Sequence, residues 1–135
     1  MILKGKKVVR GKAEGEALVV HEDLSFSSID PKTGIGREKG HALEGKSIAG
    51  KILVIPTGTG STGGSYVIYG LAKARVAPAA ILTEKADEIT ATGAIMGSIP
   101  MVHKFAKDPS KIIKTGDRLV VDGEKGIVEV VESKG

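Results

Sequence analysis

The sequence has no cysteine and no tryptophan, and its only aromatic side chains are two Phe and two Tyr. Without thiols the chain can form no disulfide, and it offers no thiolate nucleophile, no zinc–thiolate site and no ligands for an iron–sulfur cluster. The scarcity of aromatics removes the stacking platforms that single-stranded nucleic acids need. No apolar run approaches the ~18 residues that span a bilayer, and the basic residues at the start of the sequence are not followed by the apolar segment of a signal peptide. These absences predict a cytoplasmic protein that binds neither membrane nor nucleic acid.

The chain has 135 residues and a net charge of +4, with a predicted pI of 9.3. This length suits a single domain, residues 1–135, with a core built mainly from Val, Ile, Leu and Ala. The basic excess is concentrated in the first twelve residues. We expect this cluster to form a solvated basic edge strand rather than a nucleic-acid site.

Hydrophobic patterning predicts a β-rich fold with few helices. Residues 51–55 and 79–82 are short, continuous apolar runs typical of buried strands, and helical spacing of apolar residues between them predicts a helix over 66–75. Asp87 can cap a second helix over 87–97, although its glycines and threonines make that helix intrinsically weak. Further strands are expected at 6–10, 15–20 and 100–103, and a hairpin at 118–122 and 126–131. The fold class is therefore α/β: a β-barrel-like mixed sheet with one or two helices packed on one side.

Two segments lack regular patterning and are candidates for function. The long polar stretch over 25–36 includes the turn signal Asp30-Pro31-Lys32-Thr33-Gly34, and long loops in compact domains are often functional. The glycine-rich segment 56–65 joins an expected strand to an expected helix. The first turn of a helix has unpaired N–H groups and the positive end of the helix dipole, and glycines let a ligand approach the backbone closely. This segment therefore predicts an anion-binding turn.

Three more specific interpretations apply to this turn. A Walker A loop fails, because Gly64-Ser65 stands where Lys-Ser/Thr is required. A dinucleotide fingerprint fits Gly58-x-Gly60-x-x-Gly63 with Glu84 about 20 residues on, but too few residues follow for a second mononucleotide-binding half. In the third interpretation, Ser61 or Ser65 only caps the helix. The residues alone leave the purpose of the anion-binding turn open.

Longer motifs add a resemblance. The segment 49–82 closely resembles the small subunit of the aconitase X family, through Gly60-Ser61-Thr62-Gly63-Gly64-Ser65 and the strand–helix–strand around it. Upstream, Ser25-Phe26, Asp30-Pro31-x-Thr33-Gly34 and His41-x-Leu43-x-Gly45 also match. Downstream, Ala86-Asp87-x-Ile89, Gly93-Ala94-Ile95 and Ile99-Pro100 continue the match, so the resemblance covers nearly the whole chain.

The resemblance implies a swivelling β/β/α domain that closes over a cysteine-containing large subunit, in a heterodimer or larger assembly. It implies a [4Fe–4S] cluster on that large subunit and no cofactor ligated by this chain. The implied activity is a hydro-lyase, active only as a complex, that dehydrates (R)-5-phosphomevalonate to trans-anhydromevalonate 5-phosphate in archaeal isoprenoid biosynthesis. Dehydration of cis-3-hydroxy-L-proline and a stand-alone phosphometabolite- or nucleotide-binding module remain alternatives.

By the same resemblance, Ser61 is the proton acceptor, with Ser65 as the second choice and Thr62 a weaker one. Substrate contacts are expected from the turn, namely Gly60, Thr62, Gly63, Gly64 and Ser65, and no metal ligand is expected. Arg37, a lysine or the partner would supply a cation near Ser61. His41 and His103 are more often structural in such positions. Residues 80–102 also resemble phosphohistidine carrier domains, but Ala91-Thr92-Gly93 stands where those domains need a histidine.

Overall fold

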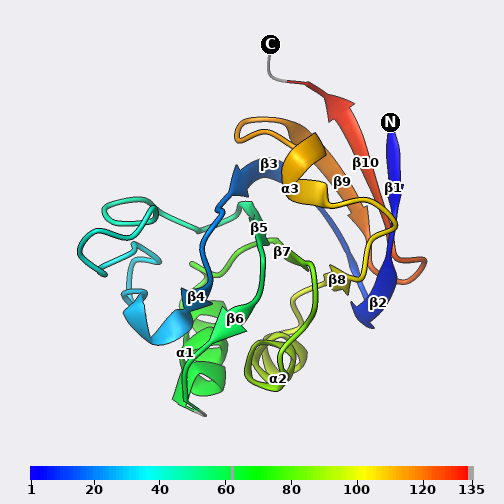
Figure 1. The fold of residues 1–135 in the computed structure, drawn as a ribbon. Helices are drawn as coiled ribbons and strands as arrows, with labels where there is room; N and C mark the ends of the chain where they lie inside the picture. Colours follow the sequence, from blue (N-terminus) through cyan, green and yellow to red (C-terminus); the bar gives the residue numbers. More distant parts are fainter. Residues whose placement is uncertain (62, 134–135) are drawn as a thin grey trace.

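The structure is a computed structural model that describes residues 1–61 and 63–133. Eight strands form one mixed sheet in the order β1-β10-β9-β3-β5-β7-β8-β2, and a two-stranded ladder joins β4 to β6 (Figure 1). In chain order the elements are β1 (Ile2–Lys4), β2 (Lys6–Val9), β3 (Lys12–Val19), β4 (Leu24–Ser25), η1 (Phe26–Ser28), β5 (Ile52–Ile55), β6 (Gly58–Thr59), α1 (Gly63–Lys73), β7 (Ala80–Thr83), α2 (Glu88–Gly97), β8 (Met101–His103), α3 (Pro109–Ile112), β9 (Arg118–Asp122) and β10 (Ile127–Glu132).

The sheet closes into a barrel at Gly5. β1 and β2 lie at opposite ends of the strand order, yet only Gly5 separates them in the chain. The Gly5 N–H donates to Gly126 O at 2.8 Å, and a Cβ at Gly5 would lie 2.7 Å from His103 O. A glycine is needed here because the backbone passes so close to two neighbouring segments. The basic N-terminal residues thus form the closing strand.

The central strands bury both faces. β3, β5, β7 and β8 run parallel, and every residue of β5 and β7 is buried. Alternate residues of β5 belong to two cores: Ile52 and Val54 join the barrel interior, whereas Leu53 and Ile55 pack with the residues of α1 and α2. This double burial explains why β5 and β7 are continuous apolar runs in the sequence.

Helices α1 and α2 cover one face of the sheet and pack closely against each other (Figure 1). A Cβ at Gly93 would lie 2.7 Å from Ile68 Cβ, and one at Gly97 would lie 3.0 Å from Ala72 Cβ. The glycines that weaken α2 as an isolated helix are therefore the residues that let α1 approach it. Tertiary contact compensates for the poor helix propensity.

Most of the predicted elements are confirmed. The strand–helix–strand unit corresponds to β5, α1 and β7, although α1 starts at Gly63 and ends at Lys73. The second helix, the strand near 101 and the C-terminal hairpin lie within two residues of their expected bounds. The mixed α/β class is confirmed. The prediction missed β1, the β4–β6 ladder, η1 and α3, which have only two to four residues each and so show no periodicity.

Candidate active site

The glycine-rich turn lies beyond the carboxyl end of β5, where the chain passes through β6 and enters α1. β6 pairs in parallel with β4, with Leu24 opposite Gly58 and Ser25 opposite Thr59. This ladder brings the polar segment that begins at Ser25 to the turn. Ligands in α/β folds commonly bind at the carboxyl ends of parallel strands, just before the following helices.

Asp87 anchors the beginning of the turn. One carboxylate oxygen, Oδ1, accepts a hydrogen bond from the Gly58 N–H at 3.0 Å, and Oδ2 accepts one from the Thr90 N–H at 3.0 Å. The same side chain therefore caps α2 and holds the backbone of β6. Gly58 has no room for a side chain, because a Cβ there would collide with Thr90 Oγ1 and lie 2.6 Å from Asp87 Oδ1.

Gly60 shapes the next part of the turn. Its φ is +108°, a conformation that residues with a Cβ rarely adopt, and a Cβ there would lie 2.8 Å from Ser25 Oγ. Ser25 is half-buried, and its hydroxyl lies directly against Gly60, the residue that precedes Ser61. Ser25 belongs to the upstream motif Ser25-Phe26, but the motif alone does not place it beside the turn.

Ser61 is exposed at the start of α1. Its carbonyl oxygen accepts a hydrogen bond from the Gly64 N–H at 2.9 Å, so Ser61 takes part in the first turn that leads into the helix. The first turn of α1 contains no acidic residue, whereas α2 has Glu88 there and Asp87 as its cap. The positive dipole end of α1 is therefore not offset by a carboxylate in its first turn, unlike that of α2. An uncompensated positive end favours an anion beside it.

Ser65, the second candidate for the base, is buried between the helices. Its hydroxyl donates to Ile89 O of α2 at 2.7 Å. This bond satisfies the hydroxyl proton and links α1 to α2. Among the expected substrate contacts, Gly63 is exposed and Gly64 is buried against Ile89, while Thr62 lies outside the described residues.

Arg37 lies on the segment that the β4–β6 ladder brings to the turn. Its N–H donates to Ser28 O at 2.8 Å, and the Ser28 hydroxyl donates to Ser25 O at 2.6 Å. The exposed guanidinium acts on Asp30: the pKa of Asp30 is lowered mainly by the hydrogen bond from the Lys32 N–H and, more weakly, by the charge of Arg37. The backbone of Arg37 is thus connected to the residue that packs against Gly60.

Both candidate histidines bond to nearby backbone. The buried His41 accepts from the Leu43 N–H through Nδ1 at 3.0 Å, so Nε2 carries the ring proton and donates to Asp23 O at 3.1 Å. His103 Nδ1 accepts from the Ala86 N–H at 2.9 Å. Burial, followed by the charges of Lys104 and Lys6, lowers the pKa of His103. These bonds give both rings a structural role.

Two buried threonine hydroxyls were not among the predicted site residues. Thr83 Oγ1 and Thr90 Oγ1 have no hydrogen-bond partner among the described residues. Thr90 Oγ1 lies against Gly58, under the turn, and Thr83 ends β7 opposite Ile55. The spacing from Asp87 to Thr90, one helical turn, was the only sequence signal that could have placed Thr90 near the cap.

The described residues do not form a metal site. In residues 1–61 and 63–133, no group of three or more His, Asp or Glu side chains could hold a metal ion, and the full sequence has no cysteine. The resemblance implies an iron–sulfur cluster on the large subunit, and this chain has no thiolate with which to ligate one. Within the same residues no helix is long and apolar enough to cross a membrane.

Comparisons with known proteins agree with this architecture. A phosphomevalonate dehydratase small subunit from Thermococcus kodakarensis is 53% identical over 133 residues, covering 98% of each chain. One from Methanosarcina mazei is 48% identical over 130 residues, covering 96% of this chain and 90% of that protein. The crystal structure of Thermococcus kodakaraensis aconitase X in its holo-form superposes with a TM-score of 0.92 at 52% identity, over 98% of this chain and 99% of that one. Residues 2–130 match the family model of the aconitase X swivel domain, and the chain belongs to that family.

Proposed function

We propose that this chain is the small subunit of a dehydratase that converts (R)-5-phosphomevalonate to trans-anhydromevalonate 5-phosphate, and that Ser61 accepts the proton. The observation that carries the proposal is its identity of about half, over nearly the full length, to relatives named phosphomevalonate dehydratase small subunit in Thermococcus and Methanosarcina. The name of these relatives also implies a large-subunit partner.

The proposed chemistry is an elimination. The base removes a proton from the carbon next to the one that bears the hydroxyl, the electron pair forms the double bond, and the hydroxyl leaves with a proton as water. Ser61 suits the role of base because its side chain is exposed at the turn, whereas the hydroxyl of Ser65 already donates to Ile89. A serine hydroxyl is a very weak acid in water, so its anion needs local stabilisation. The positive dipole end of α1, next to Ser61 in the chain, provides such stabilisation.

Several parts of the site belong to the partner in this proposal. The large subunit holds the iron–sulfur cluster, which supplies the chemistry that removes the hydroxyl when it is bound. The small phosphorylated substrate lies between the two chains, in the cytoplasm of the cell. What this chain contributes is the turn that carries Ser61: Asp87 holds its beginning, and Ser25 packs against Gly60.

The test is reconstitution of this chain with its large subunit, followed by assays with (R)-5-phosphomevalonate and with cis-3-hydroxy-L-proline. We expect turnover of the phosphorylated substrate only. Ser61→Ala should reduce turnover at least a thousandfold while the complex still assembles, and Ser133→Ala, at an exposed position after β10, is the matched control. Near-normal turnover by Ser61→Ala would refute the assignment of the base, and turnover of the hydroxyproline alone would refute the assignment of the substrate.

A further inference from the structure

Exposed apolar side chains are concentrated on α1 and α2. Seven large hydrophobic side chains are exposed among the described residues, and four of them lie on these two helices: Tyr66, Tyr69, Ile95 and Met96. Tyr66 is 71% exposed. A groove of about 250 Å³ runs between the helices, lined by Ser65, Tyr66, Glu88, Ile89, Thr92 and Met96. We call it the α1–α2 groove.

From this surface we infer that the α1–α2 groove is a docking site for the large subunit, an inference that rests on the proposed function. The partner surface that fits it is apolar, with a cationic side chain facing Glu88 at the rim. Tyrosine is enriched among the residues that dominate interface affinity, because it buries a large area with little loss of side-chain freedom.

Position relative to Ser61 identifies the occupant. Tyr66 belongs to the first turns of α1, and the Gly64 N–H of the same helix donates to the carbonyl oxygen of Ser61. Ile89, on the other side of the groove, packs against Gly64, and Asp87 ties the start of α2 to the turn. The groove therefore opens beside the turn. We therefore expect a partner that packs around Ser61 to contact Tyr66 as well.

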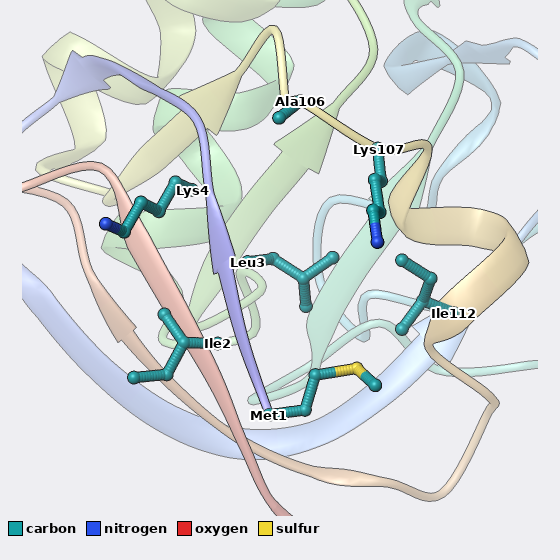
Figure 2. Close-up of a pocket in the computed structure, with 7 residues that line it drawn as sticks. All are labelled: Met1, Ile2, Leu3, Lys4, Ala106, Lys107 and Ile112. Carbon is teal, nitrogen blue, oxygen red and sulfur yellow. The ribbon is translucent and has the colours of Figure 1, made fainter.

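A second apolar surface provides the contrast. A cavity of about 350 Å³ lies between β1 and the segment around α3, lined mostly by Met1, Ile2, Leu3, Ala106 and Ile112, with the Lys107 ammonium directed into it (Figure 2). This cavity is on the side of the barrel away from α1 and α2 (Figure 1). It shares no residue with the turn or with the α1–α2 groove, so a partner that completes the Ser61 site need not touch it.

The experiment compares Tyr66→Ser with Ile2→Ser. Each variant replaces an exposed apolar side chain with serine, at 71% and 58% exposure, on the two contrasting surfaces. The dissociation constant for the large subunit is measured by isothermal titration calorimetry or sedimentation, and turnover is followed as the large subunit is titrated. We expect Tyr66→Ser to raise the dissociation constant at least tenfold and to shift the turnover curve by the same factor. Ile2→Ser should change neither by more than twofold, and Tyr66→Phe should restore binding.

Three outcomes would overturn the inference: unchanged binding by Tyr66→Ser, equal weakening by Ile2→Ser, or a dimer of this chain alone that Tyr66→Ser abolishes. The last outcome would mean that a second copy occupies the groove. Failure of the proposed function looks different: the wild-type complex would form, and Tyr66→Ser would weaken it, but the complex would not dehydrate (R)-5-phosphomevalonate. Circular dichroism of the isolated variants confirms that each is folded.

Discussion

Asp87 gives the sharpest test of how the Ser61 turn is held. Its two carboxylate oxygens accept different hydrogen bonds. Oδ2 accepts from the Thr90 N–H and so caps α2, whereas Oδ1 accepts from the Gly58 N–H of β6. A lost N-cap costs about 1 kcal/mol. A buried N–H left without a partner costs about 1–3 kcal/mol, and Gly58 is buried. Asp87→Ala should therefore lower the free energy of unfolding by about 2–4 kcal/mol.

Asp87→Ser separates the two contributions. Serine caps helices nearly as well as aspartate, but its side chain is one atom shorter and cannot also hold Gly58. We expect this variant to lose only the Gly58 bond, at about 1–3 kcal/mol. Its turnover in the complex should fall through kcat, because the turn that presents Ser61 is no longer anchored.

Urea unfolding followed by far-UV circular dichroism measures the stability of both variants, and amide hydrogen exchange reports on the Gly58 N–H directly. The Gly58 amide should exchange faster in Asp87→Ser and Asp87→Ala than in the wild type. Stability and Gly58 exchange that both match the wild type in Asp87→Ser would refute the reasoning. A loss of unfolding free energy in Asp87→Ser as large as that in Asp87→Ala would also refute it, because the helix cap would then contribute nothing to the loss in Asp87→Ala.

Two further predictions concern the helix pair and pH. Gly93→Ala should destabilise the protein by about 1–2 kcal/mol, because its Cβ would lie 2.7 Å from Ile68 Cβ, and overpacking outweighs the gain in helix propensity. Gly70 lies on α1, and a Cβ there would have no heavy atom within 4 Å, so Gly70→Ala should stabilise the protein by up to about 1 kcal/mol. Urea unfolding measures both variants. A stabilising Gly93→Ala or a destabilising Gly70→Ala would contradict the reasoning. The lowered pKa of His103 contributes stability that is complete above pH 6.5, its ordinary value, and is lost as the pH falls below it. His103→Asn, which can still accept from the Ala86 N–H, should weaken the decline of unfolding free energy between pH 7.5 and 5, and an unchanged decline would contradict the assignment.

Local patterns in the sequence were sufficient for the longer elements. The apolar run that became β5, the helical spacing of α1 and the cap at Asp87 each depend on residues within a few positions of one another. Such patterns report burial on one or both faces, which is why the mixed α/β class with helices on one side was predicted correctly. The glycine-rich turn was also located correctly, between a strand and the N-terminus of a helix.

The short elements could not be predicted in the same way. The β4–β6 ladder consists of two residues on each side, and its pairing depends on where β5 delivers the chain rather than on the propensity of Leu24 or Gly58. Barrel closure at Gly5 likewise needs β8 and β10 in place on either side. These contacts join residues far apart in sequence, and no periodicity encodes them.

The composition by itself determined that the chain has no thiolate ligands, and the order of its motifs predicted an anion-binding turn between a strand and a helix. Only the tertiary structure decided how that turn is held. It bonds Asp87 to Gly58 across 29 residues, directs the Ser65 hydroxyl to Ile89 and leaves Ser61 exposed. The physical reason is that two serines four residues apart are chemically equivalent in a sequence. They differ once the packing of α1 on α2 buries one of them and gives its hydroxyl a partner.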